Sequence, residues 1–472
     1  MPSTKRIRDP IHGLIRFEAE SEVDQLAWRL LDAPEMQRLR SIKQLGFLHL
    51  VFPGATHTRF GHSVGVYHVA RQLLGVIRRE LGPGSFDERR ARVSALAALL
   101  HDIGHGPLSH VFEKSERAVG GPGNHEHWSR AVLCGDTAVR QILDDAETGL
   151  AGLVADEICG DGPDDIYASV VASHFDADRL DYLQRDRRMT GVASGSIDLT
   201  WLLDSLRVES LADRWGGGRG LVLASKGLRS AEEYLLARIN LYRQVYLHKT
   251  SRGAELMLEA AIVRLAELIA DGSVSLTGLT RPHPLLDHVG GPRGLASFLS
   301  LDDEVLGGAL AEMAGAGDVH LAELASRLRR RRIFKCFDAG ERIPERGLQF
   351  SIRFRARLRA EAPAWGLVEG LDLLSDEAAI DAISSAGPHG PGSQRAVLVK
   401  PSPNGAPVEI TKVSKLVASI APERVLRFYV PGEEDRTALA RLWDQLQKEA
   451  GGRAFRPVSP AAPPGRPTRS RT

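Results

Sequence analysis

Residues 99–110, LLHDIGHGPLSH, decide the fold of this chain. They end the segment RVSALAALLHD, which is apolar almost all round and therefore predicts a buried central helix, with Gly104 as its stop. Neighbouring His101 and Asp102 at the end of such a helix are costly to bury without partners. A divalent metal ion removes that cost, because neutral imidazole and carboxylate groups are good metal ligands. The stretch therefore predicts a helical core built around a metal site.

Three other segments carry side chains of the same kinds. His62 lies at the start of an apolar helix in HTRFGHSVGVYHVARQLL, and HEHW places His125 soon after the central stretch. In FDADRLDYLQRD, helical spacing puts Asp178, Tyr182 and Asp186 on one stripe. For each segment alone a plainer alternative is structural: a hydrogen-bonded boundary histidine, or a solvated helix face with Asp–Arg pairs.

Residues 230–270 predict one long helix. On it, Arg238, Tyr242, Tyr246 and Lys249 follow at spacings that form a single stripe. Cations that alternate with aromatic rings on one face are typical of a site for phosphate together with a sugar or base. The alternative is a surface face with long side chains lying along it.

The composition is that of an ordinary globular protein. The chain has 472 residues, of which 43% are hydrophobic and 26% charged, and its net charge of +1 gives no global bias toward nucleic acid or membrane. Its three cysteines, Cys134, Cys159 and Cys336, predict neither a disulfide framework nor a CxxC metal site. No apolar run approaches the roughly 20 residues of a membrane span, and the N-terminus lacks a signal-peptide pattern. We therefore expect a cytoplasmic protein that does not contact membranes.

Composition and hydrophobic pattern divide the chain into three parts. Residues 1–335 begin with a β-hairpin at 6–18, continue as helices and include a short strand after WGGGRG. Residues 336–450 predict a small α/β lobe with strands in RAVLVKP and RVLRFYV and a flexible linker near 384–393. Residues 451–472, rich in Pro, Ser and Arg, predict a disordered tail.

The order of the ligand-type residues, His62, then His101 and Asp102, then Asp178, resembles the HD-domain metal-dependent phosphohydrolases. Further motifs resemble the deoxynucleoside triphosphate triphosphohydrolases of that superfamily, which include a mammalian SAM-and-HD-domain enzyme and bacterial relatives. In chain order these motifs are RDPIHG, RLRSIKQLG, VFPGATHTRFGHS, HDIGHGPLSHVFE, NHEHWS, DADRLDYLQRD, YLHK and RRRIFK. The resemblance covers about residues 6–435. It implies a mainly α fold: an HD-domain helical core with small β-hairpins and a C-terminal α/β lobe.

The resemblance also implies roles for individual residues. The metal ligands would be His62, His101, Asp102 and Asp178. The catalytic histidines would be His105 and His125 near the α-phosphate, with His110 contacting substrate. Phosphates would be held by Arg59, Arg238 and Lys249. The sugar and base would be contacted by Gln44, Leu45, Tyr182, Asp186 and Tyr246, the last near C2′ where it rejects a ribose hydroxyl.

Several positions depart from the family pattern. Glu113 replaces an aspartate, Arg179 a lysine and Tyr242 a histidine. At the regulatory site of the mammalian enzyme, Arg8 stands where an asparagine contacts the activating nucleotide. Two other residues of that region match the family, Asp32 and Arg40. The departures leave the predicted metal ligands intact and concern substrate selection and activation.

The expected activity is hydrolysis of deoxynucleoside triphosphates to a deoxynucleoside and inorganic triphosphate, with Mg, Mn, Fe, Zn or Ni as cofactor. A homo-oligomer and a nucleotide activator are the expected partners. One alternative is a nucleotidase or phosphodiesterase acting on nucleoside monophosphates or signalling nucleotides. A second is a non-catalytic regulator that binds nucleotides or nucleic acid through RLRRRRIFK and the Arg-rich tail. Nucleotide-pool control and defence against phage are both compatible settings.

Overall fold

The computed structural model describes residues 1–472 except 1–2, 194, 212–216, 341–346, 381–395 and 451–472. The chain forms two compact units, one of residues 1–334 with 378–424 and one of residues 335–377 with 425–472. The linker expected near 384–393 and the tail expected at 451–472 lie outside the described residues.

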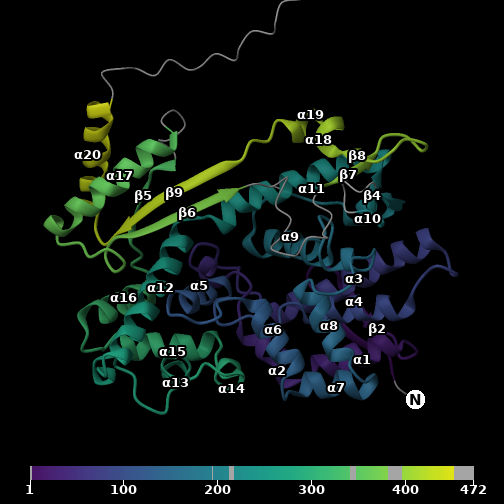
Figure 1. The fold of residues 1–472 in the computed structure, drawn as a ribbon, viewed down its shortest axis with the longest axis horizontal. Helices are drawn as coiled ribbons and strands as arrows, with labels where there is room; N and C mark the ends of the chain where they lie inside the picture. Colours follow the sequence, from purple (N-terminus) through teal and green to yellow (C-terminus); the bar gives the residue numbers. More distant parts are fainter. Residues whose placement is uncertain (1–2, 194, 212–216, 341–346, 381–395, 451–472) are drawn as a thin grey trace, which may run out of the picture. The chain divides into compact units, whose positions relative to one another are not determined.

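Helices dominate the first unit (Figure 1). Its N-terminal α-helices are α1 (Glu22–Leu31), α2 (Pro34–Arg38), α3 (Arg59–Leu81), α4 (Glu88–Leu100), α5 (His110–Ala118), α6 (His125–Cys134), α7 (Ala138–Ala146), α8 (Leu150–Cys159) and α9 (Ala177–Thr190). The later ones are α10 (Leu199–Ser205), α11 (Leu228–Leu241), α12 (Lys249–Ala270), α13 (Pro284–Gly290), α14 (Leu295–Leu299), α15 (Asp303–Met313), α16 (Val319–Arg329), α18 (Ile410–Val413) and α19 (Lys415–Ala418). The predicted mainly helical fold is confirmed.

The centre of this unit is α4, as the sequence predicts. Every residue from Val93 to Leu100 is buried, and α4 packs against both α3 and α8, which lie beside it in Figure 1. Asp87 caps its N-terminus by accepting hydrogen bonds from the backbone N–H groups of Arg89 and Arg90. An apolar helix buried on all sides fixes where its last residues point, so α4 delivers the chain directly into the interior.

Small sheets edge the first unit. The predicted hairpin is β1 (Lys5–Asp9) and β2 (Gly13–Phe17), antiparallel. A second sheet has the order β3 (Leu206–Ser210), β4 (Arg219–Ala224), β7 (Leu398–Lys400) and β8 (Val408–Glu409). Because β7 pairs in parallel with β4, residues 378–424 belong to the first unit, and the expected lobe of residues 336–450 is divided between the two units.

The second unit has its own core. Its elements are β5 (Lys335–Asp338), α17 (Gly347–Glu361), β6 (Leu374–Ile380), β9 (Glu423–Val430) and α20 (Glu433–Ala450), with strand order β5-β9-β6. Trp443 of α20 is fully buried, and its ring centroid lies 4.9 Å from that of Phe354 of α17. The two strands predicted in RAVLVKP and RVLRFYV both form, as β7 and β9, but in different sheets.

The prediction of one helix over residues 230–270 is wrong. The helix α11 ends at Leu241, a π-helical turn spans Tyr242–Tyr246, and α12 begins at Lys249. His248 has an extended backbone and caps α12 by accepting from the N–H of Thr250. A π-helical turn widens the helix by one residue, which hydrophobic periodicity does not reveal, and such turns occur often at functional sites.

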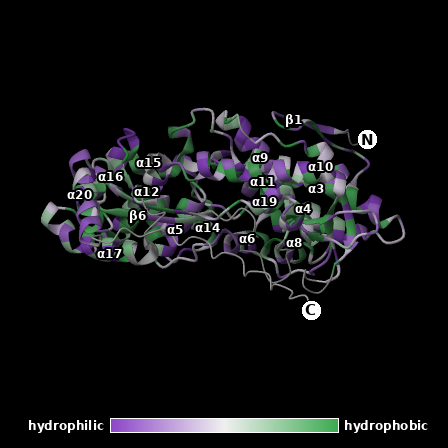
Figure 2. Cartoon of the chain, turned by 90° about the horizontal axis from the view of Figure 1, so that it is seen from above, coloured by the Kyte–Doolittle hydropathy of each residue, from purple (hydrophilic) through white to green (hydrophobic). Residues whose placement is uncertain are grey.

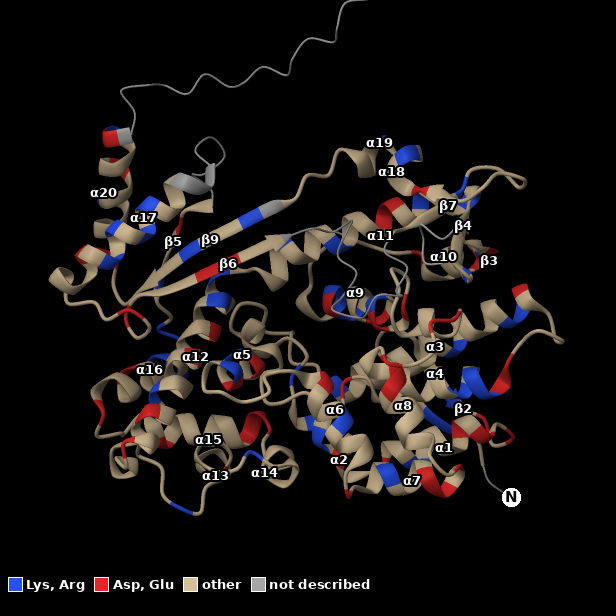
Figure 3. Ribbon diagram, viewed as in Figure 1, with Lys and Arg blue, Asp and Glu red and all other residues tan. Residues whose placement is uncertain are grey.

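Hydrophilic and hydrophobic residues are interspersed along the helices (Figure 2), and within the described ranges no helix has the length and apolar character needed to cross a bilayer. Charges of both signs are likewise mixed along the ribbon (Figure 3), in keeping with the net charge of +1.

We predict that Leu99→Ala in α4 lowers the free energy of unfolding by roughly 2–5 kcal/mol, because it leaves a cavity beside the end of the helix that carries the predicted metal ligands. Leu416→Ala is the matched control, since Leu416 is 45% exposed whereas Leu99 is fully buried. Urea denaturation followed by circular dichroism measures both. Equal, small losses for the two variants would contradict the central role of α4.

Candidate metal centre

Three helices bring the predicted metal ligands together. His62 lies on α3, His101 caps the C-terminus of α4, and Asp178 lies in the first turn of α9; one ligand atom from each falls within 4.8 Å of the others. His62 Nε2 is 2.9 Å from Asp178 Oδ1 and 3.7 Å from Asp102 Oδ2. His101 Nε2 is 3.3 Å from Asp102 Oδ1 and 3.6 Å from Asp178 Oδ1. The four side chains therefore surround one small volume.

The charges of this cluster suit a cation. Burial raises the pKa of Asp102, but Arg59, His101 and His105 outweigh it and hold that pKa well below its usual range. Burial lowers the pKa of His62, but hydrogen bonds to Asp178 and Asp181 outweigh it and raise the pKa to about 10. The carboxylates are thus ionised, and positive charge is favoured at the point they share.

The donor set fits a divalent metal ion. Imidazole nitrogens and carboxylate oxygens are ligands that Mn, Fe, Zn and Ni accept, and Nε2 of His101 is buried without a hydrogen-bond partner among the described residues. A buried nitrogen that makes no hydrogen bond is costly even beside carboxylates, and a metal ion bound there would remove that cost. Since a metal-bound imidazole must be neutral, a metal ion bound by His62 would displace the proton that this ring holds.

The predicted catalytic histidines form a second cluster next to the first. Glu113 Oε1 lies 3.0 Å from His105 Nδ1 and 3.2 Å from Nδ1 of both His110 and His125. The rings of His105 and His125 stack with centroids 4.2 Å apart. His105 Nε2 also lies 3.2 Å from Asp102 Oδ1, which joins the two clusters. Glu113, one methylene longer than aspartate, gathers all three histidines.

A strained turn places His110. Leu108 and Ser109 adopt φ values of 51° and 59°, in the left-handed region that non-glycine residues avoid. Polar contacts hold the turn: the N–H of Leu108 donates to Asp303 Oδ1 over 2.7 Å, and Ser109 Oγ accepts from Arg59 Nε over 2.7 Å. The turn reverses the chain so that α5 begins at His110, beside His105.

Gly104 does not act as the helix stop that the sequence predicts, because α4 already ends at Leu100. Its role is close approach to α6. A Cβ at Gly104 would lie 2.2 Å from both the carbonyl oxygen of His125 and the backbone nitrogen of Ser129. The N–H of Gly104 also donates to Ser129 Oγ over 3.1 Å. Glycine at this position thus lets His125 reach the cluster.

Arg59 is tied to the metal ligands. It is 3% exposed, and its Nη1 lies 2.6 Å from Asp102 Oδ2. Arg238 of α11 is also buried, whereas Lys249, the first residue of α12, is exposed. The three predicted phosphate contacts thus differ in burial, and Arg59 is held in an ion pair with Asp102.

Two side chains contact Asp186, one of the predicted sugar contacts. The hydroxyl of Tyr246 donates to Asp186 Oδ2 over 2.7 Å, and His57 Nε2 lies 2.8 Å from Asp186 Oδ1. The rings of Tyr182 and Tyr246 lie edge to face with centroids 6.2 Å apart. Gln44 and Leu45, also predicted to contact the sugar and base, are half-buried just before the short helix Gly46–Leu50. His57 therefore belongs to this group as well.

Sequence reasoning missed Asp181. Its carboxylate is fully buried and lies 2.7 Å from Nδ1 of the predicted ligand His62. A usable signal exists, since Asp178 and Asp181 are three residues apart and share a helix face.

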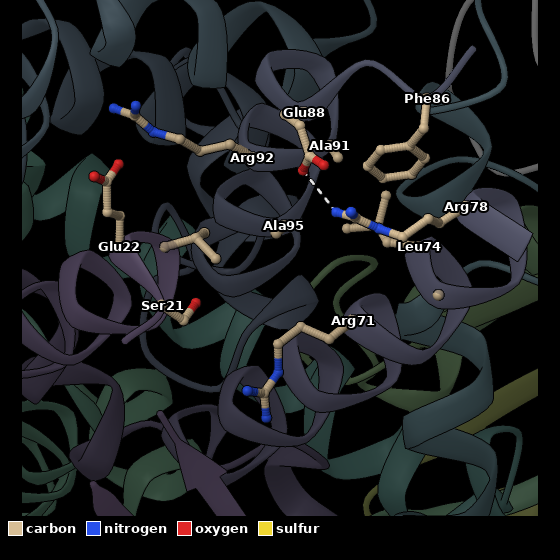
Figure 4. Close-up of a pocket in the computed structure, with 12 residues that line it drawn as sticks. Ser21, Glu22, Arg71, Leu74, Arg78, Phe86, Glu88, Ala91, Arg92 and Ala95 are labelled. Atoms are coloured by element: carbon tan, nitrogen blue, oxygen red, sulfur yellow. Dashed lines mark hydrogen bonds and ion pairs between the residues drawn. The ribbon is translucent and has the colours of Figure 1, made fainter. Parts of the chain in front are cut away.

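A cavity of about 470 Å³ is lined mainly by residues of α1, α3 and α4 (Figure 4). Among its lining residues are three arginines but none of the predicted site residues. Arg78 lies 2.6 Å from Glu88, and Arg71 lies 2.9 Å from Asp24. The residues that line the cavity include no histidine, in contrast to the candidate metal centre.

Comparisons with known proteins agree with this geometry. Residues 59–188 match the HD domain, and residues 198–281 match the HD associated region. The uncharacterized protein YwfO of Bacillus subtilis is 33% identical over 331 residues, which cover 70% of this chain and 71% of that protein. A crystal structure of a phosphohydrolase from Bacteroides thetaiotaomicron superposes with a TM-score of 0.72 at 27% identity, covering 90% of this chain and 99% of that one.

Some relatives carry a named activity. The deoxynucleoside triphosphate triphosphohydrolase SAMHD1 of Xenopus laevis is 28% identical over 314 residues, 59% of this chain and 47% of that protein. The bovine (Bos taurus) protein of the same name is 45% identical over 109 residues, 23% of this chain and 18% of its own length. This chain therefore spans about half or less of these two proteins.

We predict that His101→Ala/Asp102→Ala abolishes retention of a divalent ion, because it removes two of the four converging ligands. Elemental analysis of the purified proteins measures this directly. In the unaltered protein, chelation should also lower the melting temperature, since an ion at 100 times its Kd stabilises by about 2.7 kcal/mol. His127→Ala, at an exposed histidine on α6, should behave like the unaltered protein. Equal metal content in the double variant would contradict the assignment.

Proposed function

Because this chain belongs to the HD-domain family of metal-dependent phosphohydrolases, we propose that it hydrolyses deoxynucleoside triphosphates to a deoxynucleoside and inorganic triphosphate. The observation that carries the proposal is the junction of the two clusters: His105 Nε2 lies 3.2 Å from Asp102 Oδ1. The proposed proton-transfer residue His105 thus lies directly beside the proposed metal ligand Asp102. Deoxynucleoside triphosphate triphosphohydrolases among the relatives add support for this substrate class.

The cofactor is a divalent metal ion, which His62, His101, Asp102 and Asp178 would hold. When bound, it supplies Lewis acidity toward phosphate oxygens. Arg59 lies against this cluster through its ion pair with Asp102 and supplies a fixed positive charge. Such preorganised charge stabilises the transition state because it needs no rearrangement during the reaction.

In the proposed reaction, a water oxygen bonds to the α-phosphorus, and the bond from phosphorus to the 5′-oxygen breaks. Burial first, then Arg59 and His125, lower the pKa of His105 to about 4, so this imidazole is neutral near pH 7. It accepts the proton that the water loses, and His105 or its stacked neighbour His125 returns a proton to the leaving 5′-oxygen. Glu113 keeps both rings, and His110, in place through its three contacts.

The remaining predicted residues would select the substrate. Arg59, Arg238 and Lys249 offer several cations, which favours a triphosphate tail over a single phosphate. Around the sugar, the bond between Tyr246 and Asp186 holds the tyrosine ring in place, where it would exclude a ribose 2′-hydroxyl. The other proposed contacts to sugar and base are Gln44, Leu45 and Tyr182.

Further properties of the proposed enzyme follow from the same resemblance. We propose a homo-oligomer in the cytoplasm, with a nucleotide activator whose site includes Asp32 and Arg40. The basic run RLRRRRIFK is a weaker candidate contact for nucleic acid.

We predict that the protein with Mn²⁺ or Mg²⁺ releases inorganic triphosphate from deoxynucleoside triphosphates, and that His105→Ala lowers kcat by roughly 10²–10⁴-fold. Each dNTP and NTP is assayed with and without a second nucleotide, and triphosphate, pyrophosphate and orthophosphate are quantified separately. His127→Ala is the control and should keep full turnover. Orthophosphate from monophosphates, with no triphosphate from any dNTP, would instead identify a nucleotidase.

We predict that Tyr246→Phe weakens discrimination against ribonucleotides. The variant loses the hydrogen bond to Asp186, which contributes about 1 kcal/mol to holding the ring in place. If that free energy is lost from discrimination, the ratio of kcat/KM for dNTP to kcat/KM for NTP falls roughly fivefold. The ratio is its own control, because general damage lowers both rates together. An unchanged ratio would remove Tyr246 from sugar selection.

A further inference from the structure

Asp181 lies one turn beyond Asp178 on α9. It contacts the other nitrogen of the His62 ring from the one that faces Asp178. Its side chain is fully buried, and its Oδ2 lies 2.7 Å from His62 Nδ1. A hydrogen bond there requires that Nδ1 carry the proton. The other ring nitrogen, Nε2, then faces Asp178 at 2.9 Å and is the atom left for a metal ion.

An arginine holds Asp181 in a two-point contact. Arg185 donates from Nε to Asp181 Oδ2 over 2.7 Å and from Nη2 to Oδ1 over 2.9 Å. The same guanidinium donates from Nη1 to Asp9 Oδ2 over 2.9 Å. Paired contacts of this kind fix the plane of a carboxylate, not only its position.

The N-terminal hairpin completes the arrangement. His12, in the turn between β1 and β2, lies with Nε2 2.6 Å from Asp181 Oδ1. Asp9 shapes that turn, since its Oδ1 accepts from the N–H groups of Ile11 and His12 over 2.8 and 2.9 Å. Residues about 170 positions apart in sequence thus meet on one carboxylate.

Gly65 of α3 leaves room for this carboxylate. A Cβ at Gly65 would lie 2.0 Å from Asp181 Oδ1 and 2.3 Å from Arg185 Nη2. Glycine inside a helix costs about 1 kcal/mol relative to alanine, so alanine would be favoured there if the space were open. The glycine is explained by the close approach of Asp181 and Arg185 to the helix that carries His62.

We propose that Asp181 is a positioning residue of the metal centre, which orients His62 so that Nε2 faces the metal position, and that the β1–β2 turn holds Asp181 in place through His12 and Asp9. Outer carboxylates that bind the second nitrogen of a ligand histidine fix its orientation and strengthen metal binding. Asp181 can act in this way only if His62 binds metal, as the proposed function requires.

The test compares the unaltered protein with Asp181→Asn, Gly65→Ala and Gly75→Ala. Gly75 lies on the same helix, and in the described part of the chain a Cβ there meets nothing within 4 Å, so it is the matched control. Each protein is loaded with Co²⁺, its visible absorption spectrum is recorded, and ion release to excess chelator is timed well below the melting temperature. Circular dichroism checks folding. A purely structural role for Asp181 would alter melting but leave the spectrum and the release rate unchanged.

We expect Asp181→Asn to release Co²⁺ roughly 10–100-fold faster with an altered spectrum, and Gly65→Ala to change in the same direction while Gly75→Ala matches the unaltered protein. A folded Asp181→Asn with an unaltered spectrum and rate would overturn the proposal. If that variant does not fold, Gly65→Ala decides, and an unaltered release rate there would overturn it. If the unaltered protein binds no Co²⁺, the role of His62 is overturned as well. If His101→Ala/Asp102→Ala loses Co²⁺ while Asp181→Asn keeps it as tightly as the unaltered protein, only the role of Asp181 is refuted.

Discussion

The structure depends on two histidines and two aspartates that converge at the end of an apolar helix, where His62 and Asp102 are buried and His101 and Asp178 are partly exposed. Charges in such an interior cost several kcal/mol each unless they are paired and hydrogen-bonded. Here the partners are specific: Arg59 lies against Asp102, and His62 lies between Asp178 and Asp181. A divalent ion held there would add positive charge and give the nitrogen of His101 a ligand bond, and metal binding would then be coupled to folding of the core.

This constraint explains features that lie farther from the metal position. Two helices must come unusually close to the cluster, and glycine makes both approaches possible: Gly65 faces Asp181, and Gly104 faces α6. The strained turn at Leu108 and Ser109 reverses the chain to deliver His110. The packing that forms the first cluster therefore also places the second histidine cluster. The proposed proton-transfer residues and the proposed metal ligands lie next to each other for this reason.

Much of this arrangement could be predicted from sequence where the signal is local. Alternation and turn residues predicted the β1–β2 hairpin, and an unbroken apolar run predicted α4. The π-helical turn at Tyr242–Tyr246 could not be predicted, because one extra residue in a helical turn leaves the hydrophobic pattern nearly unchanged. Pairing of β7 with β4 joins segments about 175 residues apart and has no local signature. Asp181 was overlooked because its role depends on a ring nitrogen of a distant helix.

The most direct measurement is a crystal structure of the protein grown with Mn²⁺ or Co²⁺, with anomalous diffraction recorded at the absorption edge of that metal. We expect one strong anomalous peak bounded by His62, His101, Asp102 and Asp178, at about 2.0–2.2 Å from the imidazole nitrogens. A peak only among the histidines around Glu113, or none on the chain, would contradict the account of a metal centre at the end of α4.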